Sequence, residues 1–118
     1  MKSLLLFSAV LGFIFTTNPT PKALLGKWQV INFENKQISE SEKTILFTFL
    51  ENGSLERSKK NDVLRKGTWK YNKENKELDL LLADKQEPET FKVLTLNNKL
   101  LRMADKNGTI IRLAKMKS

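Results

Sequence analysis

The acidic side chains are the first candidates for chemistry, because the sequence contains neither histidine nor cysteine. A chain without these two residue types lacks thiol nucleophiles, disulfides, Cys/His zinc sites and imidazole bases. The carboxylates that lie close together in the sequence are Glu40 with Glu42, Glu74 with Glu77, and Glu87 with Glu89. All three pairs occur in stretches that read as turns or loops, where carboxylates are usually solvated and rarely form an acid–base dyad. We therefore predict no catalytic residues and a protein that is not an enzyme.

Patterns for metals and cofactors are weak. The stretch "DKNG" at 105–108 resembles the start of an acidic calcium loop, but the further oxygen ligands that such a loop requires are missing. A Gly-rich phosphate loop and a serine nucleophile elbow are also absent from the sequence. We predict a turn at 105–108, no metal ion and no cofactor.

Aromatic side chains are the better candidates for contact with a ligand. The pattern Gly-x-Trp occurs twice, at 26–28 and 67–69, and holds the only two tryptophans of the chain. The side chains that could form a ligand-binding wall are Phe47, Phe49, Trp69, Tyr71 and Phe91. The alternative is that these rings fill the core of a small β domain.

The charge balance favours anionic partners only in a general way. The chain of 118 residues is 40% hydrophobic and 29% charged, as expected of one globular domain, with a formal charge of +8. The lysines are spread singly between apolar residues and do not interleave with aromatic residues. A spread of this kind is typical of a solvated surface rather than of a nucleic-acid interface, so we predict no nucleic-acid partner.

Residues 1–23 read as a signal peptide with a short linker. Lys2 provides a positive start, residues 4–15 form an apolar run of 12 residues, and Pro19 and Pro21 follow. A bilayer span needs about 17–25 residues, so this run is too short to cross. We expect a signal helix, export to the periplasm or the cell exterior, and a domain at 24–118 without a stable membrane span. Cleavage after Thr17 and cleavage after Ala23 both remain open.

The elements that must position the aromatic residues are short β-strands separated by turn residues at regular spacing. The predicted strands are 27–34, 44–50, 54–59, 67–71, 77–82, 90–96, 99–104 and 109–115. Asn52-Gly53 is a strong hairpin signal, because both residues tolerate positive φ. The two longer links are 35–43, where Ser39 and Glu42 have the spacing of a capping box for a one-turn helix, and 60–66.

Eight antiparallel strands in sequence order favour an all-β, up-and-down barrel, because closure removes both exposed sheet edges. An interior of this size is filled by side chains or holds one small ligand. A two-sheet sandwich is the alternative, although it usually brings longer connections than these.

In this setting the chain resembles the calycin group, which comprises lipocalins and fatty-acid-binding proteins, and most closely the short lipocalin-like domains of Bacteroidetes-type bacteria. The resemblance follows three segments in order: "LLGKWQV" at 24–30, the hairpin at 47–53, and "GTWKYNKENKELDLLL" at 67–82. It spans roughly residues 24–115. It implies that Trp28 lies across one end of the barrel and that a basic residue of the last strand, Arg112, packs on it as a structural pair. The chain is shorter than an animal lipocalin and lacks its disulfide, so the family's internal cavity does not follow from the resemblance.

Three functions remain open at this point, of which the last, an enzyme, would need a pocket with converging polar groups. The first is a monomeric, exported binding module that takes a small hydrophobic or amphiphilic molecule in or at the mouth of the barrel. The second is a protein-interaction module, such as an inhibitor or immunity factor, that uses the loops at 35–43 and 60–66 against an acidic protein partner.

Overall fold

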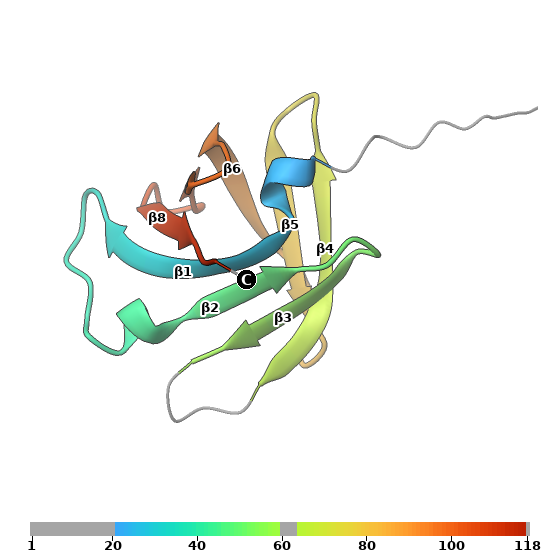
Figure 1. Cartoon of the computed structure of the whole chain (residues 1–118), viewed down its shortest axis with the longest axis horizontal. Coiled ribbons are helices and arrows are strands. Elements are labelled where there is room, and N and C mark those ends of the chain that lie inside the picture. Colours follow the sequence, from blue (N-terminus) through green and yellow to red (C-terminus); the bar gives the residue numbers. More distant parts are fainter. Residues whose placement is uncertain (1–20, 60–63, 118) are drawn as a thin grey trace, which may run out of the picture.

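The structure, a computed structural model, describes residues 21–59 and 64–117 and forms a closed antiparallel barrel (Figure 1). A short 3-10 helix, η1 (Lys22–Leu24), precedes the barrel, and a second, η2 (Glu42–Thr44), lies between the first two strands. The strands are β1 (Gly26–Phe33), β2 (Leu46–Phe49), β3 (Ser54–Ser58), β4 (Arg65–Asn72), β5 (Glu77–Leu82), β6 (Glu89–Leu96), β7 (Leu100–Ala104) and β8 (Ile110–Lys115). Each strand pairs with its sequence neighbours, and β8 pairs with β1. The predicted barrel is confirmed, and the sandwich is wrong.

The barrel closes because apolar residues recur at every second position of the strands. In β5, Leu78 and Leu80 are buried while Asp79 between them is not. In β7, Leu101 and Met103 are both fully buried. Among the residues that the structure describes, every buried side chain is apolar. The period of two thus directs one face of each strand into a common core.

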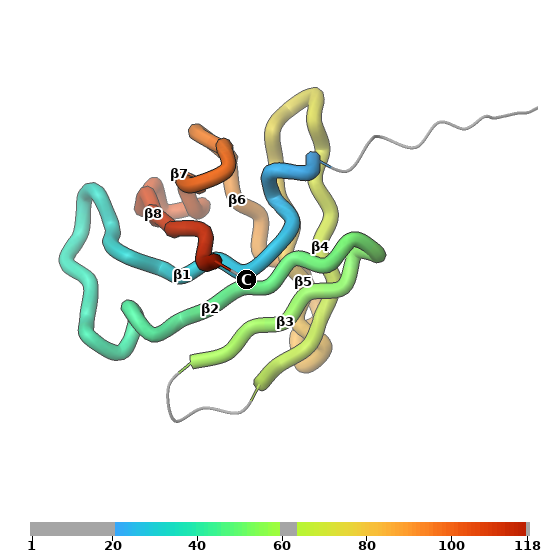
Figure 2. Tube along the Cα trace, viewed as in Figure 1, coloured from blue at the N-terminus to red at the C-terminus, as the bar shows by residue number. Residues whose placement is uncertain are grey.

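The hairpins and loops lie at opposite ends of the barrel. The tight connections at 50–53, 73–76 and 97–99 join strands at the end where β1 begins and β8 finishes, which we call the closed end. The longer connections at 34–45, 83–88 and 105–109 lie at the other end, which we call the open end. The tube in Figure 2 shows the 34–45 loop and η1 at opposite sides of the barrel.

η1 packs on the Trp28 ring at the closed end of the barrel. Leu24 of η1 and Trp28 of β1 are both 0% exposed. The Trp28 indole donates from Nε1 to the Leu24 carbonyl at 2.9 Å, so the buried donor is satisfied. The last residues of the segment predicted as signal peptide and short linker, Lys22 and Ala23, thus belong to η1, which packs on the barrel. Residues 1–20, where the signal helix is predicted, lie outside the described residues.

The predicted turns are present with one difference in mechanism. The β2–β3 hairpin closes with Gly53 at φ +86°, but Asn52 keeps a negative φ. The Asn52 side chain instead accepts a hydrogen bond from the Ser54 amide at 3.0 Å. The reciprocal bonds of the predicted capping box are present, since the Ser39 amide donates to Glu42 and the Glu42 amide donates to Ser39 Oγ, although the N-cap of η2 itself is Ser41. The link predicted at 60–66 is shorter, because β4 begins at Arg65.

Candidate ligand site at the open end

The open end of the barrel contains a cavity of about 490 Å³. Its apolar wall is formed by Phe47, Leu55, Leu80 and Leu82, which come from β2, β3 and β5. Leu55 and Leu80 are buried, so they form the deeper part of this wall. The apolar positions of three neighbouring strands thus shape the interior of the cavity.

A second cavity of about 250 Å³ adjoins the first on the side of β1, β6, β7 and β8. Its apolar wall includes Val30, Phe91, Met103 and Ile111. The residues that line both cavities are Phe47, Arg57 and Glu89. The two spaces therefore meet at one aromatic ring and two opposite charges.

Charged side chains surround the mouth. The cationic ones that line the two cavities are Lys36, Arg57, Lys85 and Lys106, and the anionic ones are Glu42, Glu87, Glu89 and Asp105. Two of these carboxylates are already engaged by the backbone. Glu42 accepts from the Ser39 amide, which lowers its pKa, and Asp105 accepts from the amides of Asn107 and Thr109 at 2.8 and 3.0 Å. The rim thus combines four cations with four carboxylates, two of which accept backbone hydrogen bonds.

The loop that follows β1 is tied to its neighbours. Asn35 donates from Nδ2 to the Gly108 carbonyl at 2.7 Å and accepts from the Ile110 amide at 3.0 Å. Gln29 donates to the Lys43 carbonyl at 3.0 Å. These bonds connect the 34–45 loop to the β7–β8 turn and to β1, so this part of the mouth is pre-organised.

The five aromatic residues predicted to bind a ligand separate into two groups. Phe47 lines both cavities and Phe91 lines the second. Phe49, Trp69 and Tyr71 line neither of these two cavities. Trp69 lies near the closed end, where its Nε1 donates to the Leu50 carbonyl at 3.0 Å. It packs edge-on against the buried Phe49 at 5.7 Å between ring centroids.

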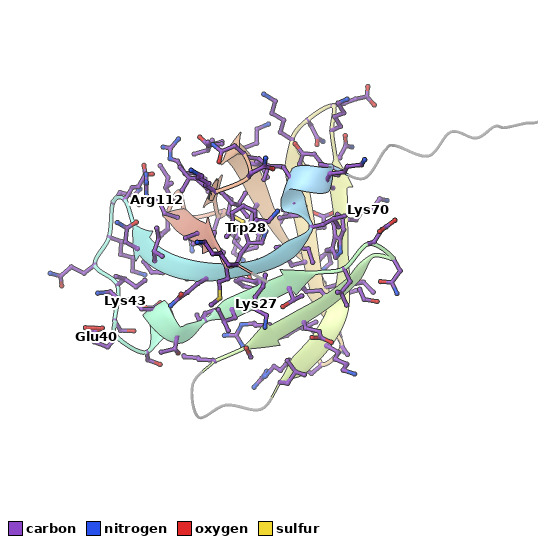
Figure 3. All side chains as sticks on the ribbon, in the orientation of Figure 1. Lys27, Trp28, Glu40, Lys43, Lys70 and Arg112 are labelled. Atoms are coloured by element: carbon purple, nitrogen blue, oxygen red, sulfur yellow. The ribbon has the colours of Figure 1, made fainter. Side chains whose placement is uncertain are left out.

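The predicted pair of Trp28 and Arg112 is wrong, because the cation over the indole is Lys115. Its Nζ lies 5.2 Å from the Trp28 ring centroid and donates to the Ala23 carbonyl at 2.9 Å. Lys115 is the register partner of Trp28, whereas Arg112 is opposite Asn32. Figure 3 labels both predicted members, with Trp28 inside the barrel and Arg112 apart from it near the other end of β1.

Arg112 instead forms a cluster with two other residues. Its Nη1 lies 3.0 Å from Glu34 Oε2, and Arg102 Nη2 donates to Glu34 Oε1 at 2.9 Å. Hydrogen bonds from Arg102 and then from Arg112, which outweigh the opposing effect of desolvation, lower the pKa of Glu34 to about 2. The same hydrogen bond raises the pKa of Arg102. This cluster links β1, β7 and β8 outside the core.

The period of two along the strands could have identified both missed cations. In β8, Ile111, Leu113 and Lys115 share one face, so Arg112 falls on the other. In β3, Leu55 and Arg57 share the inward face. This alternation is therefore sufficient to place Lys115 and Arg57 on the inward faces of their strands, Lys115 beside Trp28 and Arg57 at the mouth of the barrel.

Within residues 21–59 and 64–117, no three His, Cys, Asp or Glu side chains are grouped so that they could hold a metal ion. That same part of the chain has no helix long and apolar enough to cross a membrane.

A closed eight-stranded barrel with sequential strands and an internal tryptophan at its closed end defines a lipocalin-like architecture. The chain belongs to the family described as C-terminal lipocalin-like domain (GH43_C), whose sequence profile matches residues 14–110. No curated protein sequence matches the chain significantly.

Solved structures from Bacteroides share the fold. A lipocalin-like protein from Bacteroides uniformis is 22% identical with a TM-score of 0.65, and the match covers 80% of this chain and 99% of that one. An uncharacterized protein from Bacteroides eggerthii is 20% identical with a TM-score of 0.62, over 79% and 99% of the two chains. A DUF4847 family protein from Bacteroides vulgatus is 14% identical with a TM-score of 0.58, over 80% and 95%. At these identities the likeness concerns the fold alone.

Proposed function

We propose that this chain is an exported, non-catalytic lipocalin-like protein that binds a small apolar or amphiphilic molecule at the open end of its barrel. The observation that carries the proposal is the cavity of about 490 Å³ with its apolar wall and charged rim. Its volume falls within the range of about 300–1,000 Å³ that is typical of small-molecule sites. Phe47, which is half-buried and shared with the adjoining cavity, provides a contact surface at the centre of the site.

Two features support the absence of catalysis in this proposal. The sequence has no histidine or cysteine to act as a base or nucleophile near neutral pH. The rim carboxylate of Glu42 accepts a hydrogen bond from the Ser39 amide, which lowers its pKa and makes it a weaker base. The site therefore offers shape and charge rather than proton transfer.

The export part of the proposal is supported by the leader pattern alone: Lys2, the apolar run at 4–15 and the prolines that follow. Fractionation of host cells that express the tagged full-length chain, followed by N-terminal sequencing, tests it. We expect the protein outside the cytoplasm with a new N-terminus between residues 18 and 24. Recovery of the intact chain from the cytoplasm would contradict export and leave the binding proposal untouched.

Native mass spectrometry of the protein purified from its own host tests ligand binding. We expect an additional small mass that is lost on denaturation and reduced by Phe47→Ser at the cavity wall. Leu94→Ser is the matched control, because Leu94 is 46% exposed and lines none of the described cavities. A protein that repeatedly carries no bound mass, and that binds neither decan-1-ol nor decanoate when titrated, would overturn the binding proposal.

A further inference from the structure

Arg57 is the half-buried cation at the place where the two mouth cavities meet. It follows the buried Leu55 by two positions in β3 and is the register partner of Phe47 in β2. It thus lies on the inward face of the barrel, beside an aromatic ring. No carboxylate of residues 21–59 or 64–117 lies within ion-pair distance of it.

Arg65, the neighbour of Arg57 across the sheet, forms an ion pair and so provides a comparison for Arg57. Arg65 of β4 is its register partner, so two like charges stand directly opposite each other on the same face. Such an arrangement destabilises a sheet. Arg65 is compensated by Asp84, whose Oδ2 lies 2.8 Å from Arg65 Nη1. Arg57 has no corresponding partner in the described part of the chain and lines the cavities, whereas Arg65 lines neither of them.

Among residues 21–59 and 64–117, Glu89 of β6 is the one acidic residue that lines both cavities together with Arg57. Glu89 is exposed to solvent, while Arg57 is half-buried. Water therefore solvates the Glu89 carboxylate more fully than it solvates the Arg57 guanidinium. A partially desolvated guanidinium binds a carboxylate or phosphate through two parallel hydrogen bonds.

We infer that Arg57 binds the head group of the ligand, and that the open end selects amphiphiles with an anionic head, a carboxylate or a phosphate, over neutral ones. This inference rests on the proposed binding function. The head group lies at the junction on Arg57, and the apolar chain extends along Leu55 and Leu80 into the larger cavity. Lys85 and Lys106 at the rim attract the anion from solution.

Isothermal titration of the host-purified protein with decanoate, decyl phosphate and decan-1-ol tests the inference. We expect both anionic amphiphiles to bind about tenfold more tightly than the alcohol of equal chain length, as charge-assisted hydrogen bonds allow. Arg57→Gln removes this preference and leaves the affinity for decan-1-ol within about twofold, since the apolar wall is unchanged. Arg57→Lys keeps part of the preference, because lysine retains the charge without the fork geometry. The ratio of the two anionic ligands identifies which head group the site favours.

Arg65→Gln is the matched control. It removes the same charge from the neighbouring strand, at a residue that lines neither cavity. We expect it to leave the decanoate affinity unchanged. Glu89→Gln should raise the affinity for decanoate, because it removes the negative charge at the junction.

Two outcomes would overturn the inference while leaving the proposed function intact. They are equal affinities of the wild type for decanoate and decan-1-ol, and equal effects of Arg57→Gln and Arg65→Gln on the decanoate affinity. Binding of acetate or inorganic phosphate as tight as that of the amphiphiles would contradict the inference and the proposed function together, because the apolar wall would then contribute nothing. Failure of the wild type to bind decan-1-ol, decanoate and decyl phosphate would remove the proposed function itself.

Discussion

The two Gly-x-Trp motifs need glycine for different reasons. Gly26 begins β1 with φ +118°, a conformation that L side chains rarely adopt. Gly67 has no such φ, but β5 approaches it so closely that a Cβ would overlap the carbonyl oxygen of Leu81 and lie 2.8 Å from Leu82 Cα. The tryptophans that follow both donate to carbonyls near the closed end, Trp28 to Leu24 and Trp69 to Leu50. Both copies of the motif therefore have a structural role in the barrel.

Gly67→Ala should destabilise the barrel strongly, because the added methyl group forces β4 and β5 apart at a backbone contact that cannot rotate away. We expect a loss of about 2–3 kcal/mol in the free energy of unfolding, measured by urea denaturation. Gly108→Ala is the comparison, since nothing lies within 4 Å of its added Cβ and only its φ of +83° is unfavourable. That variant should lose about 1 kcal/mol. A smaller loss at Gly67 than at Gly108 would contradict the close approach of the strands.

Lys115→Met tests the cation over Trp28. The variant keeps the length of the side chain but removes the contact at 5.2 Å and the hydrogen bond to Ala23. We expect the free energy of unfolding to fall by about 1–2 kcal/mol and the emission of Trp28 to shift, measured in a Trp69→Phe background. Arg112→Met is the control and should leave that emission unchanged. A shift with Arg112→Met and none with Lys115→Met would restore the pair that the family resemblance implies.

Among the elements, Glu34 connects the end of β1 to β7 and β8. The folded-state pKa of Glu34, about 2, lies below its ordinary value of 4.5, because Arg102 and Arg112 stabilise the carboxylate. This stabilisation is fully present above about pH 4.5 and is lost as the pH falls toward 2. Glu42 contributes with the same sign, since the Ser39 amide lowers its pKa as well.

Glu34→Gln should therefore lower the stability at pH 7 and flatten its pH dependence between about pH 4.5 and 2. Urea unfolding followed at several pH values in this window provides the measurement. Glu40→Gln is the control, because the Glu40 side chain is 90% exposed and its ion pair with Lys43 spans 3.7 Å. If both variants show the wild-type slope, the cluster does not couple protonation to folding.

At the scale of the whole molecule, local sequence patterns predict the strands and turns. The register between distant strands determines which side chains meet inside the barrel. The eight strands, the Gly53 turn and the Ser39–Glu42 box depend on neighbouring residues, so the sequence contains the information for them. The partner of Trp28 depends on how β8 pairs with β1, 87 residues away, across a bulge between Val30 and Asn32. The placement of Trp69 depends on the β2–β3 hairpin that receives its indole. Predictions that depend on neighbouring residues therefore succeeded, whereas those that depend on the pairing of distant strands did not.

The barrel is divided along its axis into a packed closed end and a hollow open end, so stability and binding should respond to different residues. Trp69→Phe removes the hydrogen bond to Leu50 and part of the contact with Phe49, and neither Trp69 nor Phe49 lines the two mouth cavities. We expect a loss of about 1–2 kcal/mol in the free energy of unfolding with no change in decanoate affinity.

Leu82→Ala should show the opposite behaviour, because Leu82 is only half-buried and lines the larger cavity. We expect the affinity for decanoate to fall about fivefold or more as apolar contact with the chain is lost, with a loss of stability below about 1 kcal/mol. Calorimetric titration and urea unfolding on the same two variants separate the effects. If Trp69→Phe weakens binding as much as Leu82→Ala does, the ligand reaches the closed end, and the division of the barrel into two functional halves is wrong.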